Sequence, residues 1–209
     1  MEKKYTVLSE FASQFPLKSF RRNETVFFQD DPATTIYYVK SGFIKAYDID
    51  VTGAEQLLGI IGKGDFTPVA TLFEDEPTIP YFFTAFSAVE AYAIPRAAFL
   101  QLLDTDSHAL HEVTNILALR LSNTYHHLNA AEKVRADDKI AYGLYFLSRS
   151  FSNLPSKASP PVTQQDIASL IGLSRETVSQ ELKKLKDQGL IYYDKYRFTI
   201  HQDKLKEIL

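Results

Sequence analysis

The spacing of apolar residues changes near residue 104, and the first part of the chain has the texture of short strands. Aromatic and β-branched runs there lie between glycines, prolines and aspartates. The runs are ETVFFQ (24–29), TIYYVKSGFIKAYDI (35–49), YFFTAFSAV (81–89) and EAYAI (90–94). Short runs of this kind, separated by turn residues, predict strands of a β-sandwich or closed β-roll.

A long stretch without Gly or Pro follows Asp104 and continues to Gly143. Apolar residues and threonines recur within it at alternating spacings of four and three, as in the a/d seam of a coiled coil. The seam is Leu110, Thr114, Leu117, Leu121, Thr124, Leu128 and Ala131. Such a helix could pack on its own β-domain or pair with a second copy. Threonine at two seam positions suits a narrow dimer seam, so we expect a homodimer.

A second helix is predicted over residues 135–150, with Ile140, Leu144 and Leu147 on one side. The segment 152–163, SNLPSKASPPVT, is rich in Ser and Pro and is typical of a connecting loop.

The segment from Val162 to Ile191 predicts two short helices joined by a tight turn. Thr163 and Asp166 have the spacing of a capping box, and the residues after them give the first helix an apolar face. Gly172 can adopt positive φ and allows a sharp turn. Ser174 is a good N-cap for the second helix, which Gly189 ends. This arrangement is typical of a helix-turn-helix unit.

The second of these helices begins with polar residues of the kinds that read DNA bases. In a helix-turn-helix unit the N-terminal part of the second helix enters the major groove. Arg175 can donate to guanine, Glu176 can accept from cytosine, and Gln180 can pair with adenine. Ser179 lies beside them. Alternatively, the polar residues are only a favourable helix start, since Ser followed by Glu suits any helix N-terminus.

The segment 190–200, LIYYDKYRFTI, predicts a hairpin around Asp194 to Tyr196. Lys195 and Arg197 near its tip could contact phosphates, as in the wing of a winged helix. Equally, the hairpin could only close the core of this small domain.

Composition narrows the possible classes of protein. The chain of 209 residues has 23 Lys and Arg, 26 Asp and Glu, and no Cys. Residues 151–209 hold nine basic and seven acidic side chains, a balance of +2, which leaves −5 for the rest of the total of −3. A mildly basic C-terminal part suits a DNA-contacting module. Without Cys there is no iron–sulfur cluster and no thiol nucleophile.

The sequence also argues against a membrane protein. The longest uncharged apolar stretch, 77–89, contains two prolines and is too short to span a bilayer. The first 16 residues lack the apolar core of a signal peptide. We therefore expect a cytoplasmic protein with no membrane partner.

Three segments together resemble the Crp/Fnr family of bacterial transcription factors. They are GIIGKGDFTPVATLF (59–73), RLSNTYHHLNAAEKVRADDKIA (120–141) and VTQQDIASLIGLSRETVSQELKKLKDQGLI (162–191). The resemblance implies an α+β fold: a β-roll sensor domain (1–105), a dimerisation helix (106–134) and a winged helix-turn-helix domain (135–209), with the helix-turn-helix at about 163–187. It also implies a palindromic site in double-stranded DNA, and RNA polymerase as a partner of an activator.

The resemblance implies roles for single residues as well. Arg175 and Glu176 match base-reading positions of the family. Gln180 stands where well-known members have Arg, so we expect a variant of the TGTGA-like half-site. Phosphate-contacting positions of the family correspond to Thr163, Gln165, Ser174 and Thr177.

The sensor half departs from the pattern that binds cyclic nucleotides. Members that bind them have a Gly-Glu pair and an Arg-Ser pair for the ribose and phosphate. Here the matching positions are Pro68-Val69 and Ile79-Pro80. A phosphate buried there without a cationic donor would be left unpaired at a cost of several kcal/mol. We therefore expect no cyclic AMP in the usual pose. Thr124 matches a position that touches adenine, but Tyr125 follows it instead of a small hydroxyl residue.

The other kinds of sensor known in the family fit this sequence no better than a cyclic-nucleotide site does. The effector therefore stays unknown, and no cofactor is expected. All the histidines lie after the roll, which argues against haem or a metal held by roll histidines. His108 and His111 could share a metal, but solvated helix histidines are the simpler interpretation. Tyr81, Phe82, Phe83 and Phe86 are expected in the core, and the alternative is an aromatic pocket for an apolar effector.

Two other classes of function remain to be compared with a DNA-binding regulator. One is a ligand-binding regulatory module whose winged helix serves protein contacts. The other is a jelly-roll enzyme, which would need a metal cluster, a nucleophile or a phosphate loop that this sequence lacks. We expect no enzymatic activity.

Overall fold

The computed structural model describes residues 6–132, 135–150, 162–193 and 198–200. The chain forms two compact units. The first unit consists of Met1–Asp48 and Gly59–Arg120, and the second of Ile49–Leu58 and Leu121–Leu209. The α+β class predicted from the sequence is confirmed. The three-part division into sensor domain, dimerisation helix and DNA-binding domain stays a prediction.

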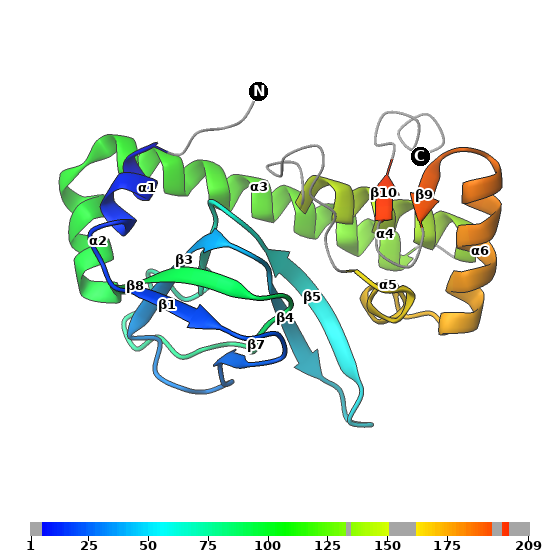
Figure 1. Cartoon of the computed structure of the whole chain (residues 1–209), viewed down its shortest axis with the longest axis horizontal. Coiled ribbons are helices and arrows are strands. Elements are labelled where there is room, and N and C mark those ends of the chain that lie inside the picture. The colour runs from blue at the N-terminus through cyan, green and yellow to red at the C-terminus, as the bar shows by residue number, and fades with distance from the viewer. Residues whose placement is uncertain (1–5, 133–134, 151–161, 194–197, 201–209) are drawn as a thin grey trace. The chain divides into compact units, whose positions relative to one another are not determined.

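The first unit is built on two antiparallel sheets, in the strand orders β1-β8-β3-β6 and β2-β7-β4-β5 (Figure 1). The strands are β1 (Leu17–Phe20), β2 (Thr25–Phe27), β3 (Thr35–Ser41), β4 (Ile44–Ile49), β5 (Glu55–Ile61), β6 (Phe66–Thr67), β7 (Phe82–Ala85) and β8 (Val89–Pro95). Strand β5 begins in the second unit and ends in the first. These strands confirm the predicted β-roll.

Strand β3 shows how the sequence places its residues in two cores. Its residues 36–39 are all buried, which is why this strand has a continuous apolar run instead of an alternating one. Tyr37 and Val39 belong to the core that also holds Phe83. Ile36 and Tyr38 belong to the core on the other side, beneath the helices.

Helices α1 (Thr6–Ala12), α2 (Arg96–Thr105) and α3 (Ser107–Glu132) supply the other side of this second core. Phe99 and Leu103 of α2 pack there with residues of the first half of α3. The Glu112 carboxylate of α3 accepts hydrogen bonds from the backbone N–H groups of Val7 and Leu8, at 3.3 and 3.1 Å. These bonds satisfy donors at the start of α1, which have no partner within the helix.

Helix α3 has two apolar stripes, and its residues up to Arg120 belong to the first unit while those from Leu121 belong to the second. Ala109, Val113 and Ile116, spaced by four and three, are buried in the core beneath the helices. Three leucines of the predicted seam, Leu110, Leu121 and Leu128, are 43%, 56% and 55% exposed, whereas Leu117 of the same seam packs against this core. The seam therefore packs on its own β-domain only in part, and the homodimer stays a prediction.

The second unit contains the helix-turn-helix. Its elements are α4 (Ala136–Ser150), α5 (Gln164–Ile171), α6 (Arg175–Asp187), β9 (Ile191–Tyr193) and β10 (Phe198–Ile200). Strands β9 and β10 pair antiparallel and confirm the predicted hairpin, although its tip lies outside the described residues. Helices α1 and α2 and strands β1 and β5 were not predicted.

The aromatic run after Pro80 is only partly core. Phe83 and Phe86 are buried, as predicted, and Phe82 is half-buried. Tyr81 is exposed, so its assignment to the core was wrong. It precedes β7, where the chain lies at the surface.

Gly42 closes the turn between β3 and β4 at a place where two backbone segments nearly touch. Its φ is +84°, and a Cβ atom on it would lie 2.1 Å from the carbonyl oxygen of Ala88. No side chain fits at that distance from a backbone atom, so the turn requires glycine.

We expect Gly42→Ala to lower the free energy of unfolding by about 2 to 4 kcal/mol, because a backbone clash adds to the strain of positive φ. Gly64→Ala is the matched control. Gly64 has φ +81°, but its nearest contact would be Tyr38 Oη at 3.9 Å, so only the conformational strain of about 1 to 2 kcal/mol applies. Chemical denaturation followed by circular dichroism measures both, and equal losses would contradict the argument.

Candidate nucleic-acid interface

Helix α5 starts with the capping box that the sequence predicted. The Thr163 hydroxyl accepts a hydrogen bond from the Asp166 N–H at 3.2 Å, and the Asp166 carboxylate accepts one from the Thr163 N–H at 2.8 Å. The two bonds satisfy backbone donors at the helix start. Ile167, Leu170 and Ile171 give the helix its buried face.

A glycine in the left-handed backbone conformation makes the turn between the two helices. Gly172 has φ +65° and ψ +40°, as expected for an αL C-cap. Two residues later, the Ser174 hydroxyl accepts a hydrogen bond from the Thr177 N–H at 3.1 Å and caps α6. The turn and the cap together fix where α6 begins.

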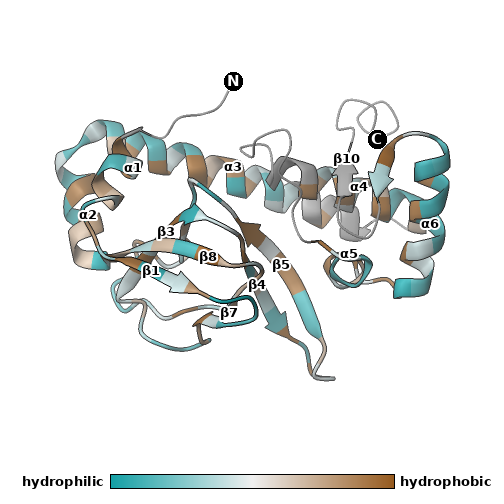
Figure 2. Cartoon of the chain, viewed as in Figure 1, coloured by the Kyte–Doolittle hydropathy of each residue, from teal (hydrophilic) through white to brown (hydrophobic). Residues whose placement is uncertain are grey.

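Helix α6 presents the predicted base-reading residues on its outer side. Val178, Leu182 and Leu185 are buried, and hydrophilic residues predominate along the rest of the helix (Figure 2). Arg175, Glu176 and Gln180 are exposed, and Ser179 is half-buried. The described part of the chain offers Arg175, Glu176 and Gln180 no hydrogen bond or ion pair, so their polar groups can meet a ligand.

The predicted phosphate-contacting residues lie at the starts of the same two helices. Thr163, Gln165 and Ser174 are exposed, and Thr177 is half-buried. The single hydroxyl proton of Thr163 is donated to Asp166 at 2.5 Å, so Thr163 could donate to a phosphate only after leaving that carboxylate. The hydroxyls of Ser174 and Thr177 bond to each other at 2.9 Å. Lys195 and Arg197, expected near the wing tip, lie outside the described residues.

The lysines of α6 differ in their availability. Lys184 pairs with Glu181 at 2.6 Å, and Lys186 donates to the Tyr193 carbonyl oxygen at 3.2 Å. Lys183 is exposed and has no partner in the described ranges. It follows Gln180 by three residues and Glu176 by seven, so it lies on their face. Sequence reasoning missed Lys183, although this spacing could have found it.

At the start of α4, the pKa of one carboxyl group is lowered. The Arg135 guanidinium donates two hydrogen bonds to the Asp137 carboxylate, at 3.0 and 2.7 Å. These bonds lower the pKa of Asp137 to about 2. The carboxylate also lies in the first turn of α4, where negative charge is favourable.

Apolar side chains occupy the positions predicted from the sequence to match the ribose and phosphate clamp of cyclic-nucleotide-binding members. Val69 is 8% exposed and Ile79 is fully buried. Pro68 follows Thr67 through a cis peptide bond. Thr67 and Thr71 are close to Val69 along the chain. Their hydroxyls are buried and have no hydrogen-bond partner in the described part of the chain. None of these residues supplies the cation that a buried phosphate needs.

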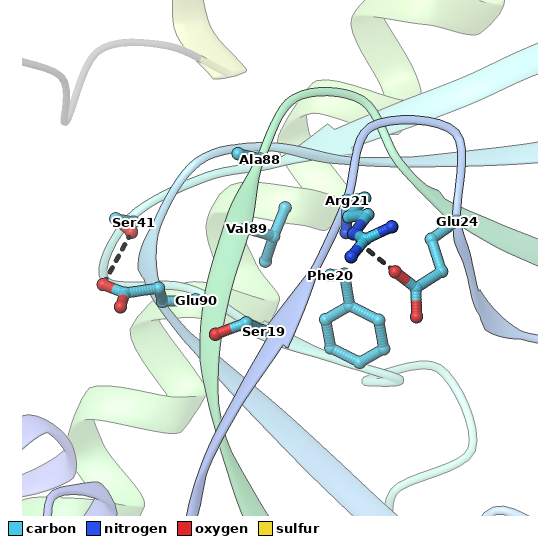
Figure 3. A pocket seen from close by; sticks show the side chains of 8 residues that line it. All are labelled: Ser19, Phe20, Arg21, Glu24, Ser41, Ala88, Val89 and Glu90. Atoms are coloured by element: carbon cyan, nitrogen blue, oxygen red, sulfur yellow. Dashed lines mark hydrogen bonds between the residues drawn. The ribbon is translucent and has the colours of Figure 1, made fainter.

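A pocket of the first unit lies at one end of the β1-β8-β3-β6 sheet (Figure 3). Ser19, Glu90 and Ser41 form one row of paired strand residues there. Ser41 donates to the Glu90 carboxylate at 3.2 Å, and the Arg21 N–H donates to Glu24 at 2.8 Å. Two of the polar groups of the pocket are thus paired with other lining residues, and Phe20, Ala88 and Val89 give the rest of the lining an apolar character.

His108 and His111 are both exposed on α3. Among the described residues, no group of three or more His, Cys, Asp or Glu side chains is placed to hold a metal ion. None of the helices in the described ranges is both long and apolar enough to cross a membrane.

Comparison with known families and proteins agrees with this geometry. The cyclic nucleotide-binding domain matches residues 17–106, and the Crp-like helix-turn-helix domain matches residues 138–208. The cAMP-activated global transcriptional regulator CRP of Pasteurella multocida is 30% identical over 186 residues, which cover 88% of this chain and 89% of the relative. The regulator of the same name from Haemophilus influenzae is 29% identical and covers 89% and 84%.

Solved structures show the same fold. FixK2 from Bradyrhizobium japonicum superimposes with a TM-score of 0.76 at 21% identity, over 92% of this chain and 96% of FixK2. The c-di-GMP responsive global regulator CLP of Xanthomonas campestris has a TM-score of 0.71 at 25% identity, over 92% and 97%.

The fold and the exposed face of α6 define a DNA-binding transcriptional regulator with a helix-turn-helix. The similarity to CRP proteins extends along almost the whole chain and identifies a family within that class. The chain belongs to the Crp/Fnr family.

The Ser174 cap gives a test of how α6 is built. We expect Ser174→Ala to lower the free energy of unfolding by about 1 kcal/mol, because the Thr177 N–H loses its side-chain acceptor. Ser174→Asn should retain most of the stability, because Asn is an equally good N-cap. Urea denaturation measures both variants, and an equal loss in both would show that the hydroxyl does not act as a cap.

Proposed function

We propose that the protein acts as a homodimer that reads a palindromic DNA site and does not use cyclic AMP as its signal. One observation carries the proposal: Arg175, Glu176 and Gln180 are exposed at the start of a capped helix that follows an αL turn, and no described residue pairs with them. A helix held in this way can enter the major groove with its N-terminal residues at the base edges.

The chemistry of these three residues favours specific contacts. The Arg175 guanidinium can donate a fork to guanine O6 and N7, and the Glu176 carboxylate can accept from cytosine N4. Gln180 can bond adenine N6 and N7. Backbone phosphates would meet Gln165 on α5 and Lys183 on α6, both exposed. Such phosphate contacts make the affinity depend on salt.

The exposed seam of α3 supports the dimer. Leu110, Leu121 and Leu128 belong to the predicted a/d seam and are about half exposed in the single chain. A second copy would bury these leucines, at about 25 cal/mol for each Å² of apolar surface removed from water. Two copies related by a two-fold axis would place their recognition helices about 34 Å apart, one turn of DNA.

The buried Val69 and Ile79 support a signal other than cyclic AMP. Relatives of this chain carry different effectors in their names, cAMP for the CRP proteins and c-di-GMP for CLP. The shared fold therefore does not determine the effector. The residues at the clamp positions are better evidence about the effector than the fold is. No cofactor and no enzymatic activity are proposed, and the protein is expected in the cytoplasm. RNA polymerase is the expected partner if the protein activates transcription.

Selection from a random DNA pool with purified, effector-free protein tests base reading. We expect one palindrome, and we expect Arg175→Ala and Glu176→Ala each to lose about 1 to 3 kcal/mol of discrimination at one base pair. Gln188→Ala, an exposed change at the far end of α6, is the control and should bind as the wild type.

If both variants keep the wild-type site and affinity, the winged helix does not read bases. The rival interpretation, a ligand-binding regulatory module that acts through protein contacts, would then stand. If the effector-free wild type selects nothing, repeating the selection with cell extract shows whether a signal is needed first.

Light scattering of the purified protein tests the dimer. We expect Leu121→Arg and Leu128→Arg each to convert a dimer into a monomer at micromolar concentration, since a charge in the seam would be buried without a partner. Gln101→Arg adds the same charge at an exposed position of α2 and should leave the dimer intact. A monomeric wild type, or dimeric seam variants, would contradict the proposed seam.

A further inference from the structure

A hairpin arm, residues 49–58, belongs to the same compact unit as the helix-turn-helix. The Asp50 carboxylate accepts hydrogen bonds from the Thr52 N–H at 2.7 Å, the Thr52 hydroxyl at 2.6 Å and the Ala54 N–H at 3.1 Å. These bonds lower the pKa of Asp50 and hold its carboxyl group ionised. The turn of the arm is thus fixed by its own residues.

Strand β5, which begins in this arm at Glu55, is the edge strand of its sheet. An edge strand has backbone N–H and C=O groups on its outer side that need partners. Ser169 of α5 supplies both. Its hydroxyl accepts a hydrogen bond from the Leu57 N–H at 2.9 Å and donates one to the Glu55 carbonyl oxygen. One side chain therefore occupies the place of a neighbouring strand.

Ser169 also connects this arm to the proposed DNA-contacting surface. It follows Gln165 by four residues, so the two lie on the same face of α5. Elsewhere on α5, Ile171 packs closely against α4, because a Cβ on Gly143 would lie 2.4 Å from Ile171 Cγ2. Helix α5 is thereby held by α4 at Ile171 and by the arm at Ser169.

We propose that Ser169 is a positioning residue for DNA binding. Its hydroxyl fixes α5 to the arm and so sets the orientation in which α5 and α6 meet the DNA. The residue touches no base. It lowers the cost of ordering the helix-turn-helix on binding, because a contact that is already ordered in the free protein need not be ordered in the complex. The inference rests on the proposed function, sequence-specific DNA binding.

Two readouts on the full-length protein test the proposal. We expect Ser169→Ala to weaken binding to the selected palindrome by about threefold to tenfold, with the same base preference at every position. Hydrogen exchange of the Leu57 amide should become faster, because this N–H loses its acceptor. Ser169→Thr retains a hydroxyl and should restore both values.

The matched control is Ser13→Ala, which removes a hydroxyl bonded to the Glu10 carbonyl oxygen at 2.7 Å in the first unit. It should change neither readout. Unchanged Leu57 exchange in Ser169→Ala overturns the proposed bond. Faster exchange with equal or tighter DNA binding overturns the positioning role. If the wild type binds no DNA, the proposed function itself is overturned. This outcome is distinguished from failure of the positioning role because it is seen before any residue is substituted.

Discussion

The burial of one stripe of α3 determines what the rest of that helix presents. Ala109, Val113 and Ile116 pack into the core beneath the helices of the first unit. Because a straight helix turns each residue by a fixed angle, burying this stripe places Leu110 and Leu121 outside the core. Leu110, Leu121 and Leu128 are exposed, while Leu117, which lies next to Ile116, packs at the border of the core. The apolar surface that a second copy would cover thus follows from how the first unit packs.

The features that the sequence predicted well are those with short-range causes. The capping box at Thr163, the turn at Gly172 and the N-cap at Ser174 each depend on residues within four positions, and all three are present. The bond between Ser169 and the Leu57 N–H joins residues 112 positions apart, and no local pattern indicates it. The prediction for Tyr81 was wrong for a related reason: an aromatic run alone does not show where the strand begins, and Tyr81 lies just before it at the surface.

The first unit has the architecture of a cyclic nucleotide-binding domain and buries apolar side chains at Val69 and Ile79. Packing depends on shape and apolar area, so a β-roll tolerates apolar side chains such as Val69 and Ile79 in its interior. Ligand binding depends on a few placed charges, and those are lost by single substitutions. The fold could therefore be recognised from residues along most of the chain. The effector depends on a few positions, and no sequence pattern identifies the molecule that they would bind.

In the proposed dimer, the half-exposed leucines of α3 would make the stability of the protein depend on its concentration. A second copy that covers them would bind only the folded chain, so association would draw molecules away from the unfolded state. In the proposed dimer, melting temperature would therefore rise with protein concentration. Dilution would weaken folding and the paired presentation of Arg175 and Glu176 together. The number of copies in a cell would then help to decide how much competent regulator exists, before any effector acts.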